Sequence, residues 1–296
     1  MDSTVPALSR AGRFSLPPGE ETSFITPGEA RLRCELVAGQ SALTSVYATS
    51  PVKLLTPRSR GKSVWTSLAT LGGGMLAGDE TSLDLEIGAG ARCLVSTQAS
   101  TKIYRNPSGR PCSHRVRAQV DDGGFLALVP DAVQCFAGAS FDQRQLITLH
   151  GNAGLVLTDW CSSGRVARGE RWAFTRYASR IEILNSTGRR LFIDSLLLDP
   201  ADGGLDSRMR LGRFNCLALL LVLGRELRAP AQELLGEVGR RPVSRRAELI
   251  CAASPIGDGA LLRIAGECLE HVANEIRARL DFLAGFLGDN PFARKW

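Results

Sequence analysis

Polar and apolar residues alternate through the middle of the chain with a period of two. Between residues 83 and 87, leucine and isoleucine alternate with acidic side chains, and the Gly-Ala-Gly stretch at 88–90 separates this run from an apolar run at 91–97. The same unit of strand, turn and strand recurs at 115–129, 145–160 and 180–198. Short strands at this spacing, joined by glycine, asparagine and aspartate turns, predict a mainly antiparallel β body. Because no fixed repeat accompanies the spacing, it does not predict a propeller, whereas a stacked or solenoid-like β architecture stays open.

Helical spacing of apolar residues is found only near the C-terminus. Residues 230–238 form a short candidate helix with proline in its first turn. Residues 266–287 form a longer candidate, with apolar positions three and four residues apart. The sequence therefore predicts a mainly β fold, a layered or superhelical body of strands with one short and one longer C-terminal helix. Without a linker-like composition shift, we expect a single β-rich domain over 31–296, preceded by a variable, partly disordered segment at 1–30.

Composition and charge exclude several classes of protein. The 36 Lys and Arg residues exceed the 30 Asp and Glu residues by six, but aromatic residues make up only 6% of the chain. The basic stretches at 36–78 and 240–246 lack the stacking aromatic pairs of a single-strand groove, so no nucleic-acid partner is expected. The longest apolar run, 216–223, is far shorter than the roughly 20 residues of a membrane span. With no secretory signal at the N-terminus, we expect a cytoplasmic protein without a membrane partner.

Cysteines and histidines do not form a recognisable metal or redox motif. The eight cysteines contain no C-x-x-C pair, and the three histidines, at 114, 150 and 271, are widely separated. The cysteines are expected to be reduced, buried thiols that pack as small hydrophobic side chains. No permanently bound cofactor is predicted.

Tests for catalytic motifs are negative. The glycine-rich segment 73–81 has Asp79 where a phosphate-binding loop needs lysine, and an alternating strand pattern follows it where a helix should begin. The chain has neither a G-x-S-x-G elbow nor an H-E-x-x-H sequence. Paired carboxylates, such as Asp79 and Glu80, leave open a β-rich hydrolase as the alternative function.

Four blocks of sequence in register resemble one family. They read LGGGMLAGD at 71–79, STQASTKIYR at 96–105, LVPDAVQCF at 128–136, and DW at 159–160 followed by SGR at 163–165 and GE at 169–170. This order and spacing is similar to that of urease accessory protein D, called UreD, or UreH in some bacteria. The resemblance extends from about residue 31 to the C-terminus, and the form of the second and third blocks looks closer to eukaryotic members.

The resemblance implies a function that composition does not reveal. Members of this family are non-catalytic proteins of nickel-urease maturation. They bind a UreF partner and, through it, the GTPase UreG, and the assembly docks on apo-urease and helps deliver nickel. The implied fold is a layered superhelix of strands with two helices, and solubility typically depends on UreF. Transient Ni2+, with no permanently bound cofactor, is the expected cargo.

Nickel that moves through a protein needs oxygen or nitrogen ligands that release it again. The resemblance implies an internal, water-filled passage, and acids along it would serve. Carried over by motif, the candidate passage residues are Asp79, Glu80, Thr101, Asp159 and Asp194. Two basic motif residues, Lys102 and Arg165, are expected to pair with such acids and hold strand ends. The alternative for all of these acids is a solvated place at a turn.

Overall fold

The computed structural model describes residues 27–58 and 60–293. Most of the predicted N-terminal segment, 1–30, lies outside the described residues, and β1 already begins at Glu29. The strands are β1 (Glu29–Val37), β2 (Gln40–Ala48), β3 (Val52–Leu55), β4 (Val64–Thr70), β5 (Glu80–Ile87), β6 (Arg92–Thr97), β7 (Thr101–Ile103), β8 (Cys112–Val120), β9 (Phe125–Val129), β10 (Val133–Cys135), β11 (Ser140–Leu149), β12 (Gly154–Ser162), β13 (Arg176–Asn185), β14 (Arg190–Leu198), β15 (Cys216–Leu223), β16 (Leu249–Ile256) and β17 (Gly259–Gly266). The helices are α1 (Arg228–Arg240), α2 (Leu269–Arg279) and α3 (Leu283–Leu287), with short 3-10 turns at Val166–Arg168, Pro200–Asp202 and Arg225–Leu227.

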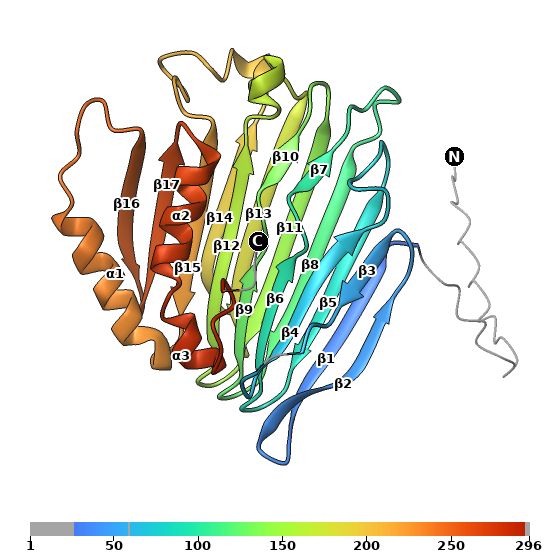
Figure 1. The fold of residues 1–296 in the computed structure, drawn as a ribbon, viewed down its shortest axis with the longest axis vertical. Helices are drawn as coiled ribbons and strands as arrows, with labels where there is room; N and C mark the ends of the chain where they lie inside the picture. The colour runs from blue at the N-terminus through green and yellow to red at the C-terminus, as the bar shows by residue number, and fades with distance from the viewer. Residues whose placement is uncertain (1–26, 59, 294–296) are drawn as a thin grey trace, which may run out of the picture.

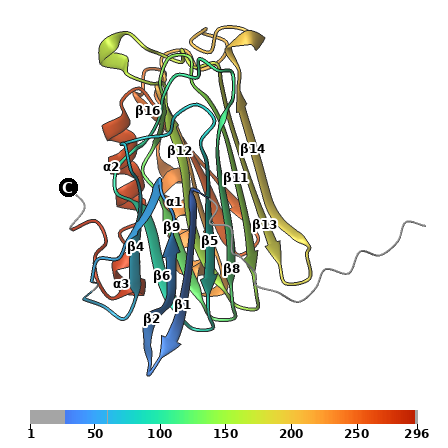
Figure 2. The same cartoon turned by 90° about the vertical axis from the view of Figure 1, so that its right-hand side faces the viewer.

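The strands form two stacked sheets, and the helices form a third layer (Figures 1 and 2). The outer sheet has the order β14-β13-β11-β8-β5-β1-β2. The central sheet has the order β16-β17-β15-β12-β9-β6-β4-β3, with β10 and β7 attached beside β12. The helices cover the face of the central sheet that points away from the outer sheet (Figure 2). The mainly β prediction is therefore confirmed.

From β5 to β12, strands that are joined by a turn cross between the sheets, whereas β1–β2, β3–β4, β13–β14 and β16–β17 pair antiparallel with their neighbours in the chain. The chain passes from β5 to β6, from β8 to β9 and from β11 to β12, each time from the outer sheet to the central sheet. Equivalent strands of successive coils then pair in parallel, as β5 does with β8 and β8 with β11. Nine of the fifteen strand pairings among the described residues are parallel, so the predicted antiparallel body is wrong and the solenoid-like alternative is confirmed.

The two sheets differ in how their strands alternate. Strand β11 of the outer sheet alternates buried and solvent-facing positions along most of its length, because its outward face meets water. Strand β9 of the central sheet is buried at every position, and β12 at every position except Asp159. Parallel strands covered on both faces have this near-continuous apolar sequence. One core cluster, which includes Leu85, fills the space between the sheets, and another, which includes Val222, lies between the central sheet and the helices.

The helices differ from their predicted lengths. The short candidate became the longest helix of the described chain, α1, with 13 residues. The long candidate at 266–287 is divided into α2, with 11 residues, and α3, with five. Tertiary contacts explain the break: the ring of Phe286 stacks on Phe125 of β9 at 5.5 Å, and the carbonyl of Leu287 accepts a hydrogen bond from the Ser63 hydroxyl at 2.8 Å. The described chain contains no helix with both the length and the apolar composition needed to cross a bilayer.

We predict that stability depends on the core between the sheets and not on apolar residues of the outer face. Leu157 on β12 is fully buried there, whereas Leu197 on the edge strand β14 is 50% exposed. Leu157→Ala should lower the free energy of unfolding by about 2–5 kcal/mol. The matched control, Leu197→Ala, should change it by no more than about 0.5 kcal/mol. Urea denaturation measures both, and similar losses in the two variants would contradict this assignment of the core.

Candidate functional site

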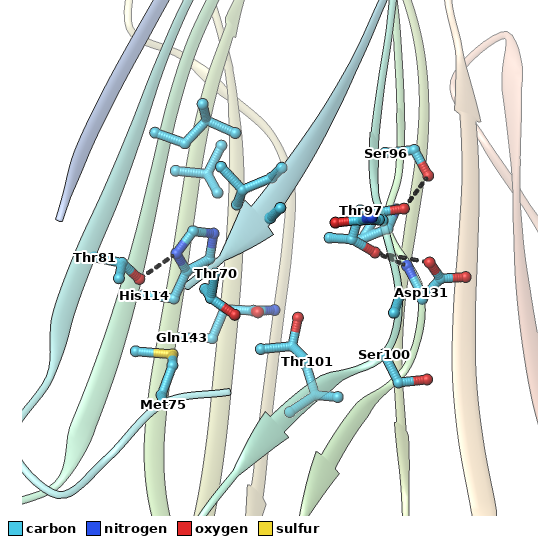
Figure 3. A pocket seen from close by; sticks show the side chains of 18 of the residues that line it. Thr70, Met75, Thr81, Ser96, Thr97, Ser100, Thr101, His114, Asp131 and Gln143 are labelled. Atoms are coloured by element: carbon cyan, nitrogen blue, oxygen red, sulfur yellow. Dashed lines mark hydrogen bonds between the residues drawn. The ribbon is translucent and has the colours of Figure 1, made fainter. Parts of the chain in front are cut away.

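A cavity of about 180 Å³, here called the inner cavity, lies between the two sheets. Thr81 of β5, His114 of β8 and Gln143 of β11 contribute to its lining from the outer sheet. Thr97, Thr101 and Asp159 contribute from the central sheet. Figure 3 shows these polar groups, apart from Asp159, facing one another across the gap. All four sequence blocks that carry the family resemblance contribute residues to this lining: Gly73 and Met75, then Ser96 to Lys102, then Pro130, Asp131 and Val133, then Asp159 and Trp160.

A second cavity of about 440 Å³, here called the outer cavity, lies where the edges of the two sheets face each other. Its lining includes Asp194 of β14, Ile250 of β16 and Arg263 of β17. Asp159 and Trp160 line both cavities. Strand β12 therefore forms a shared wall, and Asp159 is the acidic residue common to both.

Asp159 projects from the central sheet towards the outer sheet. Its Oδ1 accepts a hydrogen bond from Gln143 Nε2 at 2.8 Å, and its Oδ2 accepts one from the Ser179 hydroxyl at 2.6 Å. Asp159 is half-buried and lines both cavities. Burial raises its pKa above the ordinary value, the two hydrogen bonds partly offset the rise, and the nearby charge of Asp194 adds to it.

His114 occupies the facing wall of the inner cavity. Its Nδ1 lies 2.8 Å from the Thr81 hydroxyl oxygen, which in turn lies 3.3 Å from the carbonyl oxygen of Ser113. Burial lowers the pKa of the imidazole to about 4, so the ring is neutral at physiological pH. Figure 3 shows Nδ1 turned towards Thr81 and the other edge of the ring turned away from it, into the cavity.

Thr101 lines the inner cavity from β7, beside a hydrogen-bonded turn. The Thr97 hydroxyl donates to Asp131 Oδ2 at 2.9 Å and accepts from the backbone N–H of Asp131 at 2.7 Å. The backbone N–H of Thr101 donates to the carbonyl of Ala132 at 3.1 Å. These bonds join the second and third sequence blocks, so they fix the position of Thr101 on the cavity wall.

The carboxylate of Asp194 is paired with a guanidinium group. It forms an ion pair with Arg263 across the open side of the two sheets, although the two residues lie 69 positions apart in the chain. The carboxylate is 21% exposed and the guanidinium 56% exposed, so the pair lies at the solvent side of the outer cavity. Asp194 therefore lines the outer cavity with an arginine partner that was not foreseen, and its part in nickel handling stays a prediction.

Asp79 and Glu80 lie outside the lining of both cavities. The Oδ2 atom of Asp79 accepts a hydrogen bond from the backbone N–H of Leu76 at 2.7 Å. The backbone N–H of Asp79 donates to the carbonyl of Leu76 at 2.9 Å, which closes a turn in which Gly78 has a φ of +83°. Asp79 thus stabilises the turn before β5, and Glu80, which is exposed, begins that strand. Their part in nickel handling stays a prediction that neither cavity supports.

The two basic motif residues, Arg165 and Lys102, lie in different parts of the structure. Arg165 pairs with Glu170 of its own block, with Nε 2.9 Å from Oε2, and lies over the ring of Phe136 at 4.1 Å. Glu170 also accepts a hydrogen bond from the backbone N–H of Ala137 at 3.2 Å. These contacts hold two loops together, so the role of Arg165 is structural, as expected. Its acidic partner, however, is none of the five candidate acids. Lys102 lines the inner cavity, with an exposed side chain.

Sequence reasoning missed His114, Gln143 and Ser179. A signal for the first two was present, because residues two apart on a strand share a face. His114 shares its face with Val116 and Ala118, which are buried, and Gln143 shares its face with Ile147. A polar residue at an inward position of an alternating strand indicates an internal polar site. The described residues include no cluster of three or more His, Cys, Asp or Glu placed to hold a metal ion.

Comparisons with known proteins agree with the resemblance. The model of the family described as "UreD urease accessory protein" matches residues 26–296. A protein of Sorangium cellulosum named urease accessory protein UreD is 48% identical over 91% of this chain and 84% of its own length. Proteins named urease accessory protein D from Oryza sativa subsp. indica and Arabidopsis thaliana are 33% and 31% identical, each over 88% of this chain and over 94% and 97% of their own lengths. Plant members are thus among the relatives, although the Sorangium cellulosum protein shares more identical residues.

We predict that the Asp159 carboxylate lowers stability at neutral pH. Its pKa is raised in the folded protein, so between the unfolded and folded pKa values the folded state holds more protons, and stability falls as pH rises. Asp159→Asn removes the buried charge and keeps an amide that can bond with Gln143 and Ser179. The variant should therefore have the higher free energy of unfolding at pH 7.5, and its advantage should shrink as pH falls through the folded pKa. Urea denaturation at several pH values tests this, and an advantage that grows on acidification would contradict it.

Proposed function

Because the chain belongs to the UreD family of urease accessory proteins, we propose that it acts in urease maturation as a non-catalytic scaffold that helps deliver nickel to apo-urease. Its proposed partners are a UreF-like protein, through it a UreG-like GTPase, and apo-urease. The cargo is Ni2+, which the chain holds only in transit.

The observation that carries this proposal is the position of Asp159, which lines both cavities between the layers. Ni2+ accepts oxygen ligands, and it must bind weakly enough to move on. A carboxylate whose pKa is raised by burial meets this need, because a proton competes with the metal for it. The hydroxyl of Thr101 would supply a second oxygen from the inner cavity, and the carboxylate of Asp194 a third from the outer cavity.

The ion pair between Asp194 and Arg263 makes the outer cavity different from the inner one. A guanidinium already neutralises Asp194, so a cation meets a carboxylate there only when the pair separates. Asp159 has no ion pair among the described residues, and its hydrogen-bond donors, Gln143 and Ser179, are neutral. The stronger attraction for a cation is therefore at Asp159, inside the protein.

We predict that Asp159→Asn lowers nickel delivery without loss of the fold. The variant keeps the shape and hydrogen bonding of the side chain but loses the charge. Urease co-expressed with the variant and the other accessory proteins should contain several-fold less nickel, by metal analysis, and show correspondingly less urea hydrolysis. The matched control is Asp84→Asn, since Asp84 belongs to the solvent-facing positions of β5, which alternate with buried ones.

A comparison of the two variants distinguishes a specific role of Asp159 in the passage of nickel from a general effect of lost negative charge. Full nickel loading with Asp159→Asn would remove this residue from the path. An equal defect with Asp84→Asn would attribute the effect to net charge. Loss of binding to the UreF-like protein by Asp159→Asn would make the residue structural instead.

Partner binding is expected at one end of the sandwich. The segments at 71–79, 163–175 and 199–215 connect strands at the same end, because β4, β6 and β12 run towards it while β5 and β13 start from it. They include the turn Val166–Arg168, and this end lies at the top of Figure 1. These segments carry large apolar side chains that are more than half exposed: Leu71, Leu76, Val166 and Met209. Exposed apolar groups gathered at one end indicate a protein interface.

We predict that this end contributes to binding of the UreF-like protein and that co-expression with it raises the soluble yield. A Leu76→Asp/Met209→Asp double variant should weaken the complex at least tenfold in a pull-down or by calorimetry, because it puts charge into the apolar contact. The control is Val37→Asp, since Val37 is 50% exposed on β1 at the opposite end. Unchanged binding by the double variant would place the interface elsewhere, and a stable chain that never binds such a partner would contradict the proposed association.

A further inference from the structure

We propose that His114 supplies a nitrogen ligand, through Nε2, to a transition-metal ion that pauses in the inner cavity. This inference rests on the proposed passage of nickel and names a stopping point within it. None of the candidate residues derived from the sequence motifs is a histidine, and His114 lies outside the four sequence blocks.

The first support is the bonding of the other ring nitrogen. An imidazole that binds a metal through Nε2 must carry its proton on Nδ1, and a hydrogen-bond acceptor there fixes the ring. The Thr81 hydroxyl can provide this, because its oxygen lies 2.8 Å from Nδ1 and its own proton has an acceptor in the Ser113 carbonyl at 3.3 Å. Thr81 is itself 95% buried, so its side chain is held in place.

The second support is that Nε2 has no hydrogen-bond partner among the residues the structure describes, while the half-buried ring of His114 lines the inner cavity. A ring nitrogen that is open to a cavity and has no protein partner can take water or a metal ion as its ligand. The cavity next to the ring has room for one, and Figure 3 shows this edge of the ring turned into the cavity.

The third support is a further ligand atom near the path to Asp159. Gln143 donates through Nε2 to Asp159 Oδ1 at 2.8 Å and to the Ser179 hydroxyl at 3.3 Å. With its NH2 group so engaged, its carbonyl oxygen is the acceptor that remains for an ion. Gln143 therefore links the cavity that holds His114 to the carboxylate of Asp159.

This donor set selects a chemical class of ion. One imidazole nitrogen with carbonyl, hydroxyl and water oxygens suits Ni2+, Co2+, Zn2+ or Cu2+, whereas Mg2+ and Ca2+ prefer oxygen ligands alone. A histidine at this point would thus favour the transition metals over the abundant divalent ions. One nitrogen ligand holds the ion loosely, as a cargo site requires.

The chain offers a direct spectroscopic test, because it contains only three histidines. His150 and His271 serve as matched controls, and His271 is a surface residue 3.4 Å from Glu248. The full chain with a tag free of histidine and cysteine is loaded with Ni2+ alone, and its X-ray absorption is recorded at the nickel edge. The His150→Gln/His271→Gln double variant should keep the scattering of one imidazole. His114→Gln should lose it.

Affinity for Ni2+ gives a second readout, measured by competition with a chromophoric chelator. His114→Gln should weaken binding about tenfold or more, and Thr81→Val should weaken it by a similar factor through the lost support for Nδ1. Thr81→Ser restores the hydroxyl and should restore affinity. Mg2+ at equal concentration should not compete.

The outcomes separate this inference from the proposed function. If the double variant binds Ni2+ without an imidazole, or if His114→Gln and Thr81→Val bind as the wild type does, His114 is not a ligand. The Asp159→Asn delivery experiment is independent of that result, since it measures nickel in urease. Imidazole-bound Ni2+ at His114 together with full delivery by both Asp159→Asn and His114→Gln would support the ligand and contradict the passage.

Discussion

The central sheet cannot leave either face in water, and the rest of the architecture follows from this constraint. Strands β9, β12 and β15 are buried almost throughout, so each needs cover on both sides. The coils provide it on one side, because each of these three strands is preceded by a strand of the outer sheet. The C-terminal helices provide it on the other side, with Leu234, Val272 and Ile276 packed in one cluster with Val222 of β15.

The polar cavity exists because the alternating pattern of the outer sheet is interrupted at one end. Strand β8 turns Val116, Ala118 and Val120 inwards, but its earlier inward position is His114. Strand β11 turns Ile147 inwards, but an earlier inward position is Gln143. Buried polar groups are tolerated where they find hydrogen-bond partners. Here the Thr81 hydroxyl bonds to His114 within the outer sheet, and Gln143 donates to Asp159 of the central sheet, so a hydrogen bond joins the two sheets at the place where apolar packing stops.

The sequence located the strands well and the hairpin at 180–198 correctly, but not the partners of the strands between 83 and 160. Turns rich in glycine and aspartate, such as 121–124, suit a hairpin and an arch between two sheets equally, so the local pattern did not decide between antiparallel and parallel pairing. The near-continuous apolar run of 125–129 was the available sign of a strand buried on both faces. The motif resemblance selected Asp159 and Thr101, and both line the inner cavity. The ion pair between Asp194 and Arg263 could not be predicted in this way, because it depends on contact between strands that are distant in the sequence. The break between α2 and α3 likewise depends on the contact of Phe286 with the sheet.

The contrast between the two buried titratable groups bears on how an ion would be held and released. Burial opposes charge in both, so it raises the pKa of Asp159 and lowers that of His114. A proton therefore competes with a cation for Asp159 more than it does for an ordinary carboxylate, whereas the neutral imidazole of His114 offers a nitrogen that carries no positive charge. This competition reduces the free energy of cation binding at Asp159. A site tuned in this way binds a cation only loosely, and loose binding is the condition for passing the ion to the next ligand.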